Sequence, residues 1–343
     1  MAAIGKQIDI FPQTLKGLCI IIVVMIHLPW GVSGEETAYL WIGARKIVNF
    51  AVATFFFLSG YYNHGVDRNY LYHRLKRLLI PYVIWTCVYV FVIPYLTTGA
   101  IDREWFFYIF TGKGPLYFLL VLTQFTLLSP LLWLYKKNRA LNILFWSITP
   151  IYIIFYYWYN FNNGIEFKPE QFFCFPWFAC YYLGMKMQNW DSPLREYSIS
   201  PILMFFICLG LLMLSMIEAM FIYAKSGIFS FAISQITIGS ILYSLGVIVL
   251  FNTFWKDGRN ESRNMLTRLG DYSMGIFLMH PTFNWMYKFV FIHIPYGESL
   301  YNTTFGFMMI HIMVLVLSVS TCYFVSKELS KKFPYLIKPL GLK

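Results

Sequence analysis

Long hydrophobic runs alternate with short polar or charged segments along the whole of this chain. Ten runs of 17–25 residues stand out, at 14–30, 43–62, 78–96, 115–135, 141–159, 171–187, 199–219, 230–254, 271–291 and 304–326. A helix needs about 20 predominantly apolar residues to cross a hydrocarbon layer of ~30 Å. The pattern therefore predicts an all-α fold, a polytopic membrane helix bundle with about ten transmembrane spans.

Composition supports this prediction. Hydrophobic residues make up 58% of the 343 residues and charged residues only 13%, whereas a soluble domain contains about half apolar and about a quarter charged residues. The runs continue from one end to the other and leave no room for a sizeable soluble domain. We expect residues 1–343 to form a single integral membrane domain.

The net charge of +11 first suggests a nucleic-acid partner, but its distribution favours a membrane. With the N-terminus placed inside, the inner loops and ends hold 20 Lys and Arg residues and the outer segments hold 7. Cytoplasmic loops of membrane proteins carry such an excess. Both termini are therefore predicted to be cytoplasmic, the lipid bilayer is the expected partner, and no nucleic acid is expected.

Lys16 and His27 lie near the two ends of the first run, and ionisable groups in a membrane span are functional candidates. Eleven helical steps of about 100° exceed three full turns by only about 20° and rise ~16 Å. Both side chains are thus predicted on one helix face, with His27 close to the outer interface that Trp30 marks. A neutral imidazole suits general-base chemistry, although a structural hydrogen bond to a neighbouring helix is an alternative.

Arg74 and Arg77 are three residues apart at the cytoplasmic start of the third run, so they share a helix face. Paired guanidinium groups suit phosphate or pyrophosphate. The alternative is an ordinary positively charged anchor at the inner membrane surface. Lys76 points to another face and is interpreted as such an anchor.

Other polar residues in the runs have less specific interpretations. The Ser59–Gly60 pair permits close helix packing, and no base stands beside Ser59 in sequence to make it a nucleophile. His280, followed by Pro281, marks a polar point that is either structural or functional. Glu218 is expected to be interfacial or to line an outward cavity. The six scattered cysteines indicate packing, and no metal site is predicted.

Taken in order, these motifs resemble the membrane-bound acyltransferase-3 family, and the branch of sugar O-acetylases that includes fucose-type enzymes. The resemblance covers nearly the whole chain and rests on six segments: Lys16-x10-His27, Phe56-Phe57-Leu58-Ser59-Gly60-Tyr61, Arg74-x-x-Arg77 with Pro81-Tyr82, Gly114-x-x-Tyr117-Phe118-Leu119, Tyr181-Tyr182-Leu183-Gly184, and Tyr272-Ser273-x-x-Ile276-Phe277-Leu278-x-His280-Pro281. The chain departs from the family in two places: many relatives have Arg where it has Lys16, and Tyr117 replaces the usual Trp.

The resemblance implies a membrane O-acyltransferase in the bacterial cytoplasmic membrane. Such an enzyme moves an acyl group, usually acetyl, from cytoplasmic acetyl-CoA to a hydroxyl group of an envelope glycan or lipid-linked sugar. His27 would be the general base, or alternatively the nucleophile of an acyl-imidazole. Lys16, Arg74 and Arg77 would bind the donor. The possible pocket residues are Ser59, Tyr117 and His280. Nothing in the sequence indicates an oligomeric state.

A different class of protein also fits the intramembrane ionisable residues. A proton-coupled secondary transporter or a lipid-linked-sugar flippase would use intramembrane histidine and Glu218 for proton coupling. Against it, the two halves of the chain do not pair as inverted repeats. A non-catalytic membrane scaffold is disfavoured because it would bury aligned charges at a cost.

Overall fold

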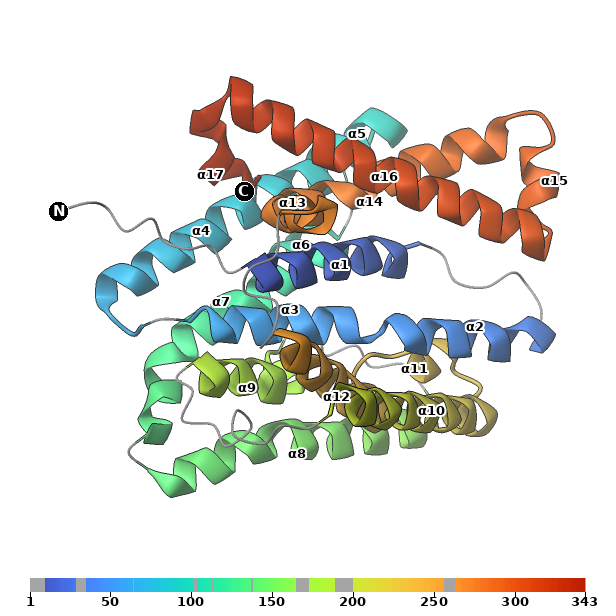
Figure 1. The fold of residues 1–343 in the computed structure, drawn as a ribbon. Helices are drawn as coiled ribbons and strands as arrows, with labels where there is room; N and C mark the ends of the chain where they lie inside the picture. Colours follow the sequence, from blue (N-terminus) through green and yellow to red (C-terminus); the bar gives the residue numbers. More distant parts are fainter. Residues whose placement is uncertain are drawn as a thin grey trace.

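The computed structural model describes residues 10–28, 35–63, 65–101, 104–112, 114–136, 138–164, 173–188, 200–255 and 263–342. Trp30 lies outside these ranges. The described residues form helices (Figure 1): α1 Ile10–Ile26, α2 Glu35–Val48, α3 Phe50–Tyr61, α4 Arg68–Cys87, α5 Ile93–Thr98, α6 Trp105–Thr111, α7 Tyr117–Leu132, α8 Arg139–Asn163, α9 Phe178–Gln188, α10 Pro201–Ser226, α11 Phe229–Ala232, α12 Ile238–Trp255, α13 Met265–Asp271, α14 Ser273–His293, α15 Gly297–Tyr301, α16 Thr304–Lys332 and α17 Ile337–Leu340.

The prediction of an all-helical, polytopic membrane bundle is confirmed. Six helices of the described chain are long and apolar enough to cross a membrane: Thr37–Tyr61, Arg68–Thr98, Trp105–Leu132, Arg139–Asn163, Pro201–Ser226 and Thr304–Lys332. Two further apolar helices, Pro12–Ile26 and Ile238–Thr253, are shorter. The other two predicted runs correspond to α9, which has 11 residues, and to α14, which has 21.

The helix that carries the second predicted span begins earlier than residue 43. Helices α2 and α3 run end to end through the middle of the bundle (Figure 1), interrupted only at Asn49. Arg45 and Lys46, two of the seven residues in the outer Lys and Arg count, are both buried. The Lys46 ammonium donates hydrogen bonds to Ser234 O at 2.9 Å, Thr237 Oγ1 at 3.0 Å and Ser240 Oγ at 2.9 Å. Those three acceptors satisfy its donors inside the bundle.

Glycines allow the backbones of the central helices to meet. A Cβ atom on Gly60 of α3 would collide with the carbonyl oxygen of Tyr181 in α9, and one on Gly184 would collide with that of Phe57. Gly17 of α1 and Gly270 of α13 abut backbone in the same way. Small residues at such crossings are typical of packing between membrane helices, so the packing interpretation of the Ser59–Gly60 pair is supported.

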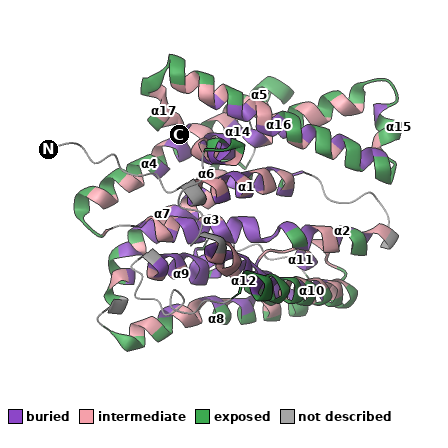
Figure 2. Cartoon of the chain, in the orientation of Figure 1, coloured by how far each residue is buried: buried purple, intermediate pink, exposed green. Residues whose placement is uncertain are grey.

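The outer helices expose large apolar side chains, as expected for a protein in lipid. Figure 2 shows α3 almost wholly buried, whereas α10 is largely exposed. The exposed side chains of α8, α10 and α16 include large apolar ones such as Ile154, Ile202 and Phe305. Apolar surface of this extent marks contact with lipid or with another protein.

Candidate functional site

One cavity of about 1110 Å³ joins the residues that the sequence singled out on α1. Lys16 lies in the first half of α1, and His27 follows its last residue, Ile26. Both line this cavity, as their spacing predicts, and the ring of His27 is exposed to it. The cavity therefore runs along one side of α1, from a cation to an imidazole.

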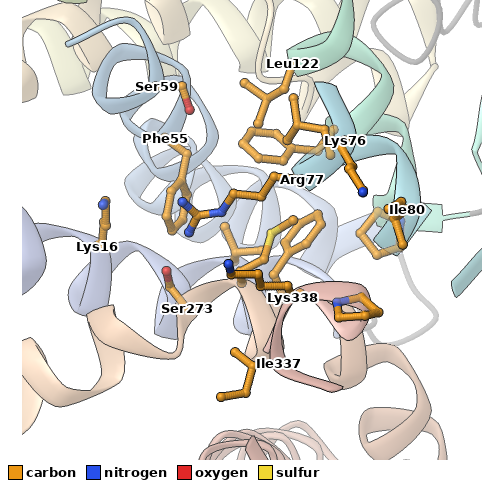
Figure 3. A pocket seen from close by; sticks show the side chains of 18 of the residues that line it. Lys16, Phe55, Ser59, Lys76, Arg77, Ile80, Leu122, Ser273, Ile337 and Lys338 are labelled. Atoms are coloured by element: carbon orange, nitrogen blue, oxygen red, sulfur yellow. The ribbon is translucent and has the colours of Figure 1, made fainter. Parts of the chain in front are cut away.

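The polar wall of the cavity gathers basic side chains from three helices. Lys16 comes from α1, Lys76 and Arg77 from α4, and Lys338 from α17 near the C-terminal end. Figure 3 shows Arg77 extending into the cavity, with Lys16 to one side and Lys338 beneath it. No hydrogen bond joins Arg77 to another described residue, so its guanidinium is open to a ligand. Such a group can bind phosphate in a bidentate manner.

Two of these cations were not predicted. Lys76 was interpreted as an anchor because it shares no face with Arg77, but the cavity extends around α4 and is closed on the other side by Pro115, Tyr117 and α17. Lys338 is far from every motif in sequence, and only the packing of α17 on α4 brings it here.

The inner wall is apolar and aromatic. Phe118 at the start of α7 packs on Phe277 of α14, with ring centroids 5.3 Å apart, and on Phe56 of α3 at 4.6 Å. Ser59 and Tyr117, both expected in a pocket, line the cavity. This lining combines an apolar body with few polar groups, the usual character of a small-molecule site.

Arg74 differs from Arg77 although it lies one turn away. It lines a smaller adjoining hollow of about 610 Å³ together with Lys16, Ser59 and Arg77. Its guanidinium is bound by protein groups: it donates to Tyr70 Oη at 2.7 Å and to Ser59 O at 3.0 Å. The two arginines therefore differ in role: Arg74 links α4 to α3, and Arg77 faces the main cavity.

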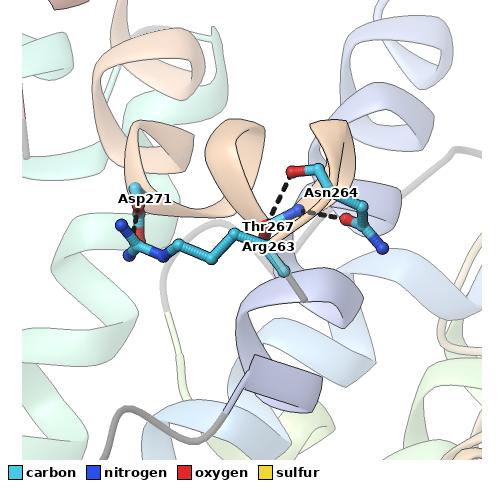
Figure 4. A network of polar contacts seen from close by, with 4 residues as sticks. All are labelled: Arg263, Asn264, Thr267 and Asp271. Atoms are coloured by element: carbon cyan, nitrogen blue, oxygen red, sulfur yellow. Dashed lines mark hydrogen bonds and ion pairs between the residues drawn. The ribbon is translucent and has the colours of Figure 1, made fainter. Parts of the chain in front are cut away.

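Helix α13 fixes the part of α1 that carries Lys16. Asn264 caps α13 by accepting a 2.9 Å hydrogen bond from the backbone N–H of Thr267, and Arg263 pairs with Asp271 at 3.0 Å (Figure 4). The backbone of α13 then packs directly on that of α1, with Gly17 against Leu266 and Gly270 against Gln13. The Lys16 ammonium lies 4.5 Å from the centroid of the Tyr62 ring, a cation–π contact.

His280 does not line the cavity, contrary to its assignment as a possible pocket residue. It is fully buried in α14, behind His27, and the centroids of the two rings are 5.1 Å apart with a tilt of 41°. Sequence offered no sign of this pairing, because the two residues are more than 250 positions apart.

Glu218 is part of a separate polar cluster near Lys46. It accepts hydrogen bonds from Tyr157 Oη at 2.6 Å and from the backbone N–H of Gly239 at 2.8 Å. These bonds anchor the start of α12, so Glu218 has a structural role in this arrangement.

Comparison with known proteins adds the family. A family described as an acyltransferase domain matches residues 9–326. The chain belongs to this acyltransferase-3 family, and the membership suggests acyltransferase activity.

The chain is also a distant relative of proteins from three strains of Staphylococcus aureus, MSSA476, MW2 and MRSA252. Each is named as a probable poly-beta-1,6-N-acetyl-D-glucosamine export protein. In each case the identity is 21% over 300 residues, which covers 80% of this chain and 82% of the relative. No solved structure matches the chain.

Proposed function

We propose that this protein is a membrane O-acetyltransferase, folded as one domain over residues 1–343 in a bacterial cytoplasmic membrane. It transfers an acetyl group from cytoplasmic acetyl-CoA to a hydroxyl group of a cell-envelope or exported polysaccharide. The observation that carries the proposal is the cavity of about 1110 Å³ with Arg77 and Lys16 on its polar wall and His27 further along α1. The family membership supports the same reaction class.

The polar wall suits the donor. CoA carries several phosphate charges, and Lys16, Arg77, Lys76 and Lys338 present four cationic side chains to one cavity. Lys16 and His27 are ~16 Å apart along the axis of α1. That leaves an extended pantetheine arm room to carry its thioester from the basic residues toward the imidazole.

His27 supplies the proton transfer in this proposal. Its ring takes the proton of the acceptor hydroxyl while the hydroxyl oxygen attacks the thioester carbonyl carbon. The carbon–sulfur bond then breaks, and the CoA thiolate leaves and receives that proton. In the alternative, an imidazole nitrogen attacks first and an acetyl-imidazole passes the acetyl group to the sugar. Both routes use the same residue and the same cavity.

Topology supports an acceptor that arrives from outside. We propose that both termini are cytoplasmic, because Lys and Arg are concentrated on one side. The burial of Arg45 and Lys46 strengthens this argument, since both had been counted on the outer side. The donor cations then face the cytoplasm, and His27 lies nearer the outer surface.

Export is the second candidate, and the name given to the Staphylococcus aureus relatives favours it. In that case the cavity would hold a sugar during translocation. The engagement of Glu218 with Tyr157 and Gly239 speaks against a proton-coupling role for that carboxylate.

Reconstituted protein separates the two candidates. Liposomes receive acetyl-CoA labelled in the acetyl group, with total envelope glycan or poly-beta-1,6-N-acetyl-D-glucosamine as acceptor. The proposal predicts alkali-labile label on the glycan and one free CoA per ester. Passage of a fluorescent glycan across the liposome without any ester formed would support export and overturn the proposal.

A further inference from the structure

The His280–Pro281 pair in α14 fixes which nitrogen of His280 carries its proton. Pro281 has no backbone N–H, so the carbonyl oxygen of Phe277, four residues earlier, lacks its helical donor. His280 Nδ1 lies 2.7 Å from that oxygen. Because a carbonyl oxygen can only accept, Nδ1 is the donor and holds the proton.

The other nitrogen is therefore a hydrogen-bond acceptor. In a neutral imidazole with a protonated Nδ1, Nε2 carries a lone pair. His280 Nε2 is fully buried and has no hydrogen-bond partner among the described residues. A buried acceptor without a partner is unfavourable, so this position favours a nearby donor.

His27 is the nearby group that can supply a donor. Its ring centroid lies 5.1 Å from that of His280, too close for a water molecule to stand in line between the rings. A hydrogen bond between two imidazole nitrogens, about 2.7–3.2 Å long, fits a centroid separation of this size when the two rings face each other edge to edge. Two further bonds hold the backbones in place: Asn284 Nδ2 donates to Val24 O at 3.3 Å, and Tyr89 Oη donates to Leu278 O at 2.7 Å.

We propose that His280 is a positioning residue, which accepts a hydrogen bond from one ring nitrogen of His27 and keeps the other nitrogen unprotonated and turned to the cavity. The inference rests on the proposed function, since it concerns the base of that reaction. Pro281 is the origin of the arrangement, because it frees the carbonyl that orients His280. A second group that orients the base in one tautomer is a recurring feature of acyl-transfer sites.

The rival explanation is that His280 only satisfies the Phe277 carbonyl. Bonds of this kind occur elsewhere in the protein: His311 Nδ1 lies 2.6 Å from Phe307 O, and His293 Nδ1 lies 2.8 Å from Phe289 O. A useful test must therefore remove the acceptor at His280 Nε2 and keep the donor at His280 Nδ1.

Two substitutions separate these roles. The amide nitrogen of Asn occupies the place of Nδ1, so His280→Asn keeps the donor to Phe277 and has no acceptor at the place of Nε2. The longer His280→Gln puts an amide oxygen near the place of Nε2 and restores the acceptor. We expect His280→Asn to lower kcat about 10–100-fold with an unchanged KM for acetyl-CoA, and His280→Gln to recover most of that loss.

His311→Asn is the matched control, because it makes the same change in a helical histidine with the same backbone bond, and it should leave kcat near the wild-type value. Equal kcat for wild type and His280→Asn, equal losses in the Asn and Gln variants, or a loss confined to KM would each overturn the proposal. Each of these comparisons requires acetyl transfer by the wild type, so none of these outcomes would contradict the proposed function.

A spectroscopic measurement does not depend on turnover. Nitrogen-15 NMR of labelled histidine in membranes reports the tautomer of His27. We expect a single tautomer in the wild type and a mixture in His280→Asn. The same mixture in both proteins would overturn the pairing, whereas a single wild-type tautomer without any acetyl transfer would refute the proposed function alone.

Discussion

The guanidinium of Arg74 donates a 3.0 Å hydrogen bond to the carbonyl oxygen of Ser59, and this bond ties the start of α4 to the end of α3. Arg77, one turn later on α4, has no such partner among the described residues and lines the main cavity. The RxxR pair therefore divides into an arginine that holds two helices together and one that faces the cavity.

This division predicts different defects for the two alanine variants. Arg77→Ala should raise the KM for acetyl-CoA by an amount worth about 1–3 kcal/mol, the usual range for a charge-assisted hydrogen bond, and should leave stability unchanged. Arg74→Ala should lower the free energy of unfolding by a similar amount, because it removes bonds between elements. Thermal unfolding in detergent and acetyl-CoA titrations measure both quantities. Equal changes in the KM for acetyl-CoA and in the free energy of unfolding for the two variants would contradict this difference in role.

Lys16 provides a test of charge at the donor side of the cavity. Lys16→Arg should keep near-normal acetyl-CoA dependence, since a guanidinium preserves the charge on a stem of similar reach. Lys16→Gln should weaken the apparent affinity, because the phosphate groups of the donor lose a compensating cation. If Lys16 only snorkels to the interface, Lys16→Gln will show wild-type dependence on acetyl-CoA. That result would contradict the proposal that Lys16 binds the donor whose thioester reaches His27.

The glycine crossing between α3 and α9 makes a prediction about stability alone. Gly184→Ala should destabilise the protein by about 1–3 kcal/mol, since the new methyl group meets the backbone of α3 and neither helix can yield easily. Gly210→Ala in α10 is the matched control: its added Cβ meets nothing within 4 Å. That change should be neutral or stabilise the helix slightly. Equal unfolding temperatures for both variants would show that the crossing is looser than described.

The topology has its own measurement. Cysteines introduced at the exposed positions Glu298 in α15 and Lys331 at the end of α16 should differ in their reaction with a membrane-impermeant thiol reagent. We expect labelling of Glu298→Cys in intact cells and labelling of Lys331→Cys only after permeabilisation. The reverse result would invert the protein in the membrane and place the donor cations outside.

Features set by local geometry were the ones that the sequence predicted. The common placement of Lys16 and His27 follows from the helical repeat within one segment, and the helical class follows from hydrophobic run length. The predicted run starts at residue 43, whereas α2 begins at Glu35. The acceptors that satisfy Lys46 inside the bundle, Thr237 and Ser240, belong to a distant segment that the local pattern does not reveal.

Features that depend on distant segments could not be predicted in this way. Lys338 reaches the cavity only because α17 packs on α4, and His280 meets His27 only because α14 packs on α1. The number of spans is a similar case. Hydropathy gave ten runs, but the helix of 11 residues at α9 depends on burial among its neighbours and is shorter than a full span.

In the proposed reaction His27 takes the proton of the acceptor hydroxyl as that hydroxyl attacks an acetyl group delivered through the cavity. Purified wild type, His27→Ala and the exposed-histidine control His293→Ala, each with an unchanged unfolding temperature, are compared in a single assay. It measures transfer of labelled acetyl from acetyl-CoA to glycan. We expect transfer by the wild type and the control, and a loss of at least about a hundredfold in His27→Ala, the contribution expected of a general base. Turnover of His27→Ala at a rate close to that of the wild type would contradict this role of His27.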